Sequence, residues 1–156
     1  MADKSCSLAE RQEILALLPQ VPPFRFLEEV LELSESHIVS TYRFGGDEFF
    51  YLGHFPGDPV TPGVILIETM AQAALVALGI YIARREDPTL RMRTLFSECE
   101  VEFFSVVRPG ARVVVHGEKV YWRRRKLQSR VELRLEDGSV AAAGIISGLG
   151  VPDDSK

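Results

Sequence analysis

The chain is poor in the residues that build disulfide frameworks and metal centres. Its 156 residues include only two cysteines, Cys6 and Cys99, and three histidines. Two cysteines make no disulfide framework, and no His, Cys, Asp and Glu residues have the spacing of zinc ligands. A phosphate-binding glycine loop and a dinucleotide-binding fingerprint are also missing. We therefore expect no metal and no cofactor.

The chain also lacks a strong charge of either sign. Its formal net charge is −4, with 26% charged and 46% hydrophobic residues, a composition typical of globular domains. The acidic balance argues against nucleic acid as a partner. No basic segment followed by an apolar one indicates a signal peptide, so the cytoplasm is the expected location. The length suits a single domain over residues 1–156.

Strongly polar side chains are almost missing from one long apolar segment. Between Val64 and Ala83, only Glu68 and Gln72 carry them. A helix that is apolar on every side is either buried in a protein or spans a membrane, and this one is long enough to span. Because a carboxylate inside hydrocarbon is costly, and strand-like sequence flanks the segment, we expect a buried central helix and no membrane span.

The start of this helix is a candidate binding site. Thr61 is predicted to cap the helix, and Pro62 suits the first helical position. The free N–H groups of Gly63 and Val64 would then point out of the N-terminus. Such a terminus can bind a carbonyl oxygen or an anion.

Two titratable side chains near this start are candidates for chemistry. Glu68 and Gln72 are four residues apart and share a helix face. Apolar surroundings should raise the pKa of Glu68, as a general acid at neutral pH requires. The alternative is a structural acid bonded to Gln72. His54 lies in a loop, Gly53 to Gly63, whose prolines and glycines predict rigidity. It is either a positioned base or a polar surface residue.

Together these residues resemble a known signature. The chain is similar to the beta-hydroxyacyl-acyl-carrier-protein dehydratases of the hotdog fold in the pattern His54-Phe55-Pro56-Gly57-x-Pro59-x-x-Pro62-Gly63, then Glu68-x-Met70-Ala71-Gln72. A glutamate at position 68 resembles the FabZ-type branch, whereas the dehydratase-isomerase branch carries aspartate. One departure is that Gln20 and Val21 stand near a place where the family often has a His-Arg pair.

The resemblance implies a fold and an assembly. The fold would be α+β, a long central helix wrapped by a curved antiparallel β-sheet. The assembly would be a homodimer, or a trimer of dimers, with His54 of one subunit meeting Glu68 of the other.

The resemblance also implies an activity. The enzyme would convert (3R)-hydroxyacyl thioesters on acyl carrier protein into trans-2-enoyl thioesters, in fatty-acid or related acyl-chain biosynthesis. His54 would be the base, Glu68 the acid, and Gln72 would orient Glu68. The N–H groups of Gly63 and Val64 would bind and polarise the thioester carbonyl. The acyl chain would need an apolar tunnel, with these candidate lining residues: Ile65, Leu66, Phe103 and Phe104.

Three other functions fit the same residues. A specialised dehydratase of a polyketide or polyene pathway would perform the same chemistry on other acyl chains. A hotdog thioesterase would release free thiol, although the His54 loop argues against it. A non-catalytic subunit that binds carrier protein would bind without turnover.

The remaining chain predicts a small helix and several hairpin-linked strands. Residues 1–19 hold an N-terminal helix over 7–18, with Ser7 and Glu10 as a capping box. Residues 150–156 are expected to be a disordered tail. Strands are predicted over 22–33, 37–44, 91–107 with a bulge, 111–121, 127–135 and 141–149.

Surface charge offers candidates for docking the acidic carrier protein. The basic run Arg123 to Lys126 is either a solvated hairpin tip or a landing patch. Other arginines compete for that role: Arg84, Arg85, Arg91, Arg93, Arg108 and Arg112. His37 and His116 fall in predicted strands, and we interpret both as structural.

Overall fold

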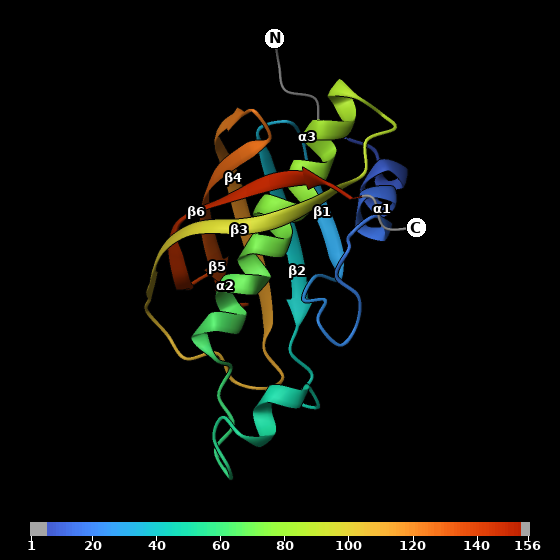
Figure 1. The fold of residues 1–156 in the computed structure, drawn as a ribbon. Helices are drawn as coiled ribbons and strands as arrows, with labels where there is room; N and C mark the ends of the chain where they lie inside the picture. The colour runs from blue at the N-terminus through green and yellow to red at the C-terminus, as the bar shows by residue number, and fades with distance from the viewer. Residues whose placement is uncertain (1–5, 154–156) are drawn as a thin grey trace.

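The computed structural model describes residues 6–153, which form one long helix and a six-stranded sheet (Figure 1). The helix consists of α2 (Gly63–Ala71), the π-helical segment η2 (Gln72–Ala77) and α3 (Leu78–Glu86). The antiparallel sheet has the order β1-β2-β4-β5-β6-β3. Its strands are β1 (Glu29–Leu33), β2 (His37–Arg43), β3 (Met92–Phe103), β4 (Arg112–Arg123), β5 (Lys126–Arg134) and β6 (Val140–Pro152).

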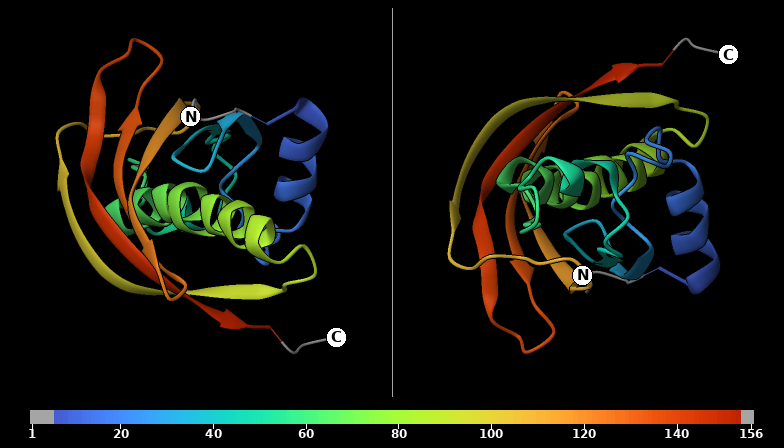
Figure 2. Two further views of the ribbon diagram at one scale, coloured as in Figure 1. Left: turned by 90° about the horizontal axis from the view of Figure 1, so that it is seen from above. Right: turned by 90° about the horizontal axis from the view of Figure 1, so that it is seen from below.

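The sheet curves around the helix, as both views in Figure 2 show. Side chains from the middle of the helix, such as Met70 and Leu78, are fully buried. The helix meets β4 closely, since a Cβ built on Gly117 would lie 2.6 Å from the Cβ of Ala74. Ser129 of β5 donates a hydrogen bond to the Ala74 carbonyl at 2.8 Å, which satisfies a buried polar group. This is the α+β hotdog arrangement that the resemblance implies.

The helix from Gly63 to Glu86 has the length and composition of a membrane-spanning segment. In this protein, however, 78% of its most apolar window is buried inside the fold. A buried core helix has the same all-round apolar character as a membrane span. The apolar run is therefore accounted for by the sheet that covers it.

Two predictions about the N-terminal third need correction. The first helix, α1 (Leu8–Ala16), is shorter than predicted, although its capping box is confirmed: the Ser7 hydroxyl accepts from the Glu10 N–H at 3.2 Å. The first strand begins at Glu29 rather than at Pro22. Prolines offer no N–H to a strand ladder, and the Phe26 N–H is bound by a helix side chain instead.

The C-terminal strands follow the predicted pattern more closely. In β5, Leu127, Ser129, Val131 and Leu133 are all buried, as their alternation predicts. The predicted bulge in β3 lies between Phe96 and Glu98. The predicted tail is wrong for residues 150–152, because β6 continues to Pro152 alongside β3. Residues 154–156 lie outside the described part of the chain.

Candidate active site

His54 lies in the loop that connects the 3-10 turn η1 (Phe49–Leu52) to the central helix. Its Nδ1 is 2.8 Å from the carbonyl oxygen of Val60. A carbonyl oxygen can only accept, so Nδ1 carries the hydrogen and donates it. The Nε2 of the neutral ring therefore keeps its lone pair and can take up a proton. This arrangement suits the predicted role of base.

The loop around His54 is closed by its own backbone. The N–H and carbonyl of Phe55 bond to the carbonyl and N–H of Asp58, at 3.1 and 2.9 Å. The Val60 N–H donates to the His54 carbonyl at 2.8 Å. Gly57 has a φ of +77°, which glycine adopts without steric cost, and the His54–Phe55 peptide is cis. Several internal hydrogen bonds thus hold the imidazole in place.

The predicted cap of the central helix is wrong by one residue. The N-cap is Pro62, and no side chain caps this helix. The hydroxyl of Thr61 instead forms a 2.6 Å hydrogen bond with the phenol of Tyr51. Thr61 is therefore used to anchor the loop to the 3-10 turn.

The N–H groups at the start of α2 are free, as the sequence predicts. The Pro62 carbonyl accepts from the N–H groups of Ile65 and Leu66 at 2.9 and 3.2 Å. Within residues 6–153, no acceptor is bonded to the N–H of Gly63 or Val64. Two donors at the positive end of a helix dipole can stabilise an oxygen that gains negative charge.

Glu68 lies further along the same helix and is half-buried. Burial among apolar side chains raises the pKa of its carboxyl group, and the hydrogen bond from Gln72 offsets only part of that increase. The Gln72 amide donates to the Glu68 carboxylate at 3.1 Å. The structure thus shows the pair that the four-residue spacing predicts.

Gln72 also bonds to a segment that sequence reasoning did not connect with the site. Its side-chain oxygen accepts from the Phe26 N–H at 2.7 Å, and its amide donates to the Phe24 carbonyl at 2.9 Å. Because Gln72 is fully buried, these bonds fix its orientation. In the sequence, these bonds are indicated only by the amide of Gln72 inside an apolar helix, because a buried amide needs hydrogen-bond partners.

The four predicted tunnel residues lie in two different settings. Ile65 and Leu66 are buried in the core, whereas Phe103 and Phe104, at the end of β3, are exposed. The Phe103 ring packs against Gly63. The tunnel itself stays a prediction.

Within one chain, no hydrogen bond or ion pair between described residues joins His54 to Glu68. Each half of the candidate site is instead prepared by its own neighbours. Among residues 6–153, no three His, Cys, Asp or Glu side chains are grouped to hold a metal ion.

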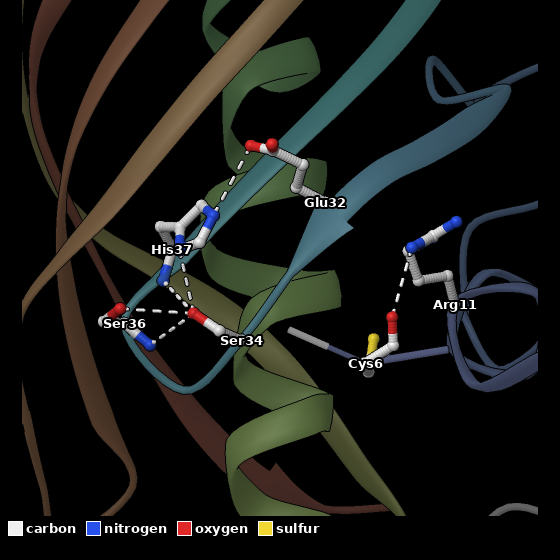
Figure 3. A network of polar contacts seen from close by, with 6 residues as sticks. All are labelled: Cys6, Arg11, Glu32, Ser34, Ser36 and His37. Carbon is white, nitrogen blue, oxygen red and sulfur yellow. Dashed lines mark hydrogen bonds and ion pairs between the residues drawn. The ribbon is translucent and has the colours of Figure 1, made fainter. Parts of the chain in front are cut away.

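The other two histidines lie outside this region. Figure 3 shows His37 with its Nδ1 2.8 Å from the Ser34 hydroxyl and its Nε2 3.5 Å from the Glu32 carboxylate. These contacts stabilise the turn between β1 and β2. His116 lies on the neighbouring β4, where burial lowers its pKa. Both positions agree with a structural interpretation.

The basic run Arg123 to Lys126 lies at the tip of the hairpin between β4 and β5. Arg124 and Arg125 occupy the turn between β4 and β5, both with positive φ. Lys126 forms an ion pair with Glu98 of β3. In Figure 1 this tip lies at the opposite end of the molecule from the His54 loop.

The sequence was compared with known families. Residues 18–143 match the FabA-like domain. The chain belongs to the FabA-like family. One FabA-like relative is the 3-hydroxyacyl-[acyl-carrier-protein] dehydratase FabZ of Streptococcus pyogenes serotype M3. It is 34% identical over 137 residues, which are 87% of this chain and 94% of that protein. The resemblance in the His54 to Gln72 motif is therefore confirmed at the level of the family.

Proteins of known structure share the fold of this chain. A chain of the dehydratase heterocomplex ApeI:P from Xenorhabdus doucetiae superposes with a TM-score of 0.74 at 19% identity, covering 90% of this chain and 91% of that one. A hypothetical thioesterase from Streptococcus pneumoniae TIGR4, solved with coenzyme A, gives 0.58 at 14% identity, covering 81% and 90%. At these identities the likeness concerns the fold alone.

Proposed function

We propose that the protein removes water from (3R)-hydroxyacyl thioesters carried by acyl carrier protein and yields trans-2-enoyl thioesters. The reaction would serve fatty-acid or related acyl-chain biosynthesis, in the cytoplasm. One observation carries the proposal. The chain is 34% identical to a FabZ dehydratase along most of its length. The hydrogen bond between His54 Nδ1 and the Val60 carbonyl and the raised pKa of buried Glu68 support the roles of base and acid.

The proposed mechanism starts at the carbon next to the thioester carbonyl. Nε2 of His54 takes a proton from this carbon, and the electron pair moves onto the carbonyl oxygen. The N–H groups of Gly63 and Val64, at the positive end of α2, stabilise that oxygen. Protonated Glu68 then donates to the 3-hydroxyl group, which leaves as water while the carbon–carbon double bond forms. Return of the proton from His54 to Glu68, through solvent, resets the enzyme.

The proposed active unit is a homodimer, or a trimer of dimers, with His54 of one subunit and Glu68 of the other. Support comes from β3, which forms an edge of the sheet and has only Met92 fully buried among its twelve residues. A long edge strand leaves backbone N–H and carbonyl groups unpaired, so it can pair with another chain. Pairing of two β3 strands would bring two half-sites together.

The test is turnover of a 3-hydroxyacyl thioester on carrier protein, followed by mass spectrometry for the loss of water. His54→Ala and Glu68→Ala should each lower kcat by roughly 10²–10⁴, as expected when a general acid or base is removed. His116→Ala should keep the wild-type rate, because His116 lies on the face of β4 opposite its buried neighbours Val115 and Gly117. Circular dichroism of each variant checks folding.

Other outcomes would contradict the proposal or redirect it. Near wild-type turnover by a folded His54→Ala or Glu68→Ala would exclude the assigned roles. Release of free thiol without an enoyl product would indicate a thioesterase. Tight carrier binding without turnover would indicate a non-catalytic subunit, whereas turnover of only unusual acyl chains would indicate a polyketide or polyene dehydratase.

A further inference from the structure

The end of β3 meets the start of the central helix where Phe103 packs against Gly63. Phe103 is the last residue of β3 and is paired with Ala142 of β6. A Cβ built on Gly63 would lie 3.0 Å from Cζ and 3.2 Å from Cε1 of the Phe103 ring. The ring therefore fills the space that any side chain at position 63 would need.

This contact lies beside the free donor of Gly63. Its N–H has no acceptor among the described residues, so it can bind the oxygen of a thioester carbonyl. The side chain of Phe103 is 47% exposed, which leaves part of the ring open while the rest covers Gly63. An aromatic ring next to a donor keeps water from that side, and a hydrogen bond to a charged oxygen is stronger where water is excluded.

We propose that Phe103 is a positioning residue that closes one side of the carbonyl site at Gly63. It would restrict the direction from which the thioester oxygen approaches the N–H and would exclude water there. It acts through Gly63 and takes no part in proton transfer. This inference rests on the proposed dehydratase function, in which Gly63 polarises the thioester carbonyl.

The same contact explains why position 63 carries glycine. In Gly63→Ala, the new Cβ would lie 3.0 Å from Cζ of Phe103, so the ring or the start of the helix has to shift slightly. The two positions should therefore be energetically coupled, and non-additive effects are the usual sign of side chains in contact.

The first experiment compares the loss of an exposed apolar side chain at two places on the sheet. Phe103→Ala should lower kcat roughly tenfold with a smaller change in KM, less than the 10²–10³ lost with a whole oxyanion donor. Phe103→Leu should lie between Phe103→Ala and wild type. Val120→Ala is the control, since Val120 is 43% exposed on β4, an inner strand of the sheet away from the β3 edge. It should keep the wild-type kcat.

The second experiment tests the coupling directly. Gly63→Ala should lose more activity than Phe103→Ala, and Gly63→Ala/Phe103→Ala should be faster than Gly63→Ala alone because the ring no longer opposes the new Cβ. If the double variant is slower than Gly63→Ala by the full factor that Phe103→Ala loses in the wild-type background, the two positions act independently. That result would overturn the inference. Melting temperature and oligomer size, measured for every variant, separate this effect from a loss of structure.

The outcomes also separate this inference from the proposed function. If wild type releases water and Phe103→Ala equals Val120→Ala in kcat, only the role of Phe103 is overturned. If wild type releases no water from any 3-hydroxyacyl thioester, the proposed function fails and this inference fails with it. If Phe103→Ala does not fold, the kcat of Phe103→Leu is compared with that of the control variant instead.

Discussion

Each of the two candidate catalytic side chains is held by one hydrogen-bonding neighbour, Val60 for His54 and Gln72 for Glu68. The Val60 carbonyl holds the hydrogen of His54 on Nδ1, which leaves Nε2 as the basic atom. For Glu68, burial favours the protonated acid, and the amide of Gln72 orients the group at 3.1 Å. Elimination of water requires a base for the carbon-bound proton and an acid for the departing hydroxyl group.

The raised pKa of Glu68 leads to a pH prediction. The acid has to be protonated, so activity is retained below its pKa and lost as the pH rises through it. Because burial raises this pKa, the decline in kcat/KM should occur at higher pH than an ordinary glutamate would give. A pH profile of kcat/KM measures it, with Glu68→Gln as control, whose residual activity should lack this decline. A decline centred at the pKa of an exposed glutamate would contradict the assignment.

Gln72 should matter for stability as well as for orientation. Gln72→Leu keeps a similar size but leaves the Phe26 N–H and the Phe24 carbonyl without their partner. Unsatisfied buried groups of this kind should lower the free energy of unfolding by about 3 kcal/mol. Chemical denaturation measures the change. The matched control is Gln128→Leu. Among residues 6–153, this half-buried side chain forms one hydrogen bond, to the Ser147 hydroxyl, so its loss should change stability little.

The side-chain contacts that could be predicted from the sequence join residues close to each other along the chain. The bond between Glu68 and Gln72 follows from helical spacing, which any four-residue separation reveals. The bonds from Gln72 to Phe24 and Phe26 cross 48 and 46 residues, and no local pattern encodes them. The predicted Thr61 cap failed because the Tyr51 hydroxyl, ten residues away, competes for the same side chain.

The central helix is buried because the sheet packs closely against it. Its apolar character predicted burial, and its length was nearly right. The π-helical segment Gln72–Ala77 was not predicted, since alanine-rich sequence is equally suited to a regular α-helix. Within that segment, the Ala74 carbonyl takes a hydrogen bond from Ser129, and its Cβ faces Gly117. Small residues on both elements thus allow the close contact.

The close approach gives a prediction for Gly117. In Gly117→Ala, the new Cβ would lie 2.6 Å from the Cβ of Ala74 and 3.0 Å from Cγ2 of Ile38, so the helix and sheet have to separate. We expect a loss of about 1–3 kcal/mol in the free energy of unfolding, the usual cost of overpacking a core. Thermal unfolding checks it. Gly53→Ala is the control, because nothing lies within 4 Å of its Cβ position and its φ is negative.

For the whole molecule, the sheet ends on one side in an open edge. Sequence patterns predicted β3 and its bulge but not that this strand would be the edge, because strand order depends on contacts far apart in sequence. Beside its exposed glutamates, β3 exposes Leu95, Phe96 and Phe103, apolar side chains that a paired chain could cover. A homodimer through this edge is the assembly in which we expect the protein to be active.

Mixing two inactive chains tests that assembly and the site together. In a dimer of one His54→Ala chain and one Glu68→Ala chain, a site shared between subunits has one intact copy, with His54 from one chain and Glu68 from the other. Random pairing on co-expression should then restore about a quarter of wild-type turnover, as two-fold symmetry dictates. A site built within each subunit, or an active monomer, would leave every site with one defect and restore nothing. Each variant expressed alone is the control, and sedimentation measures the dimer.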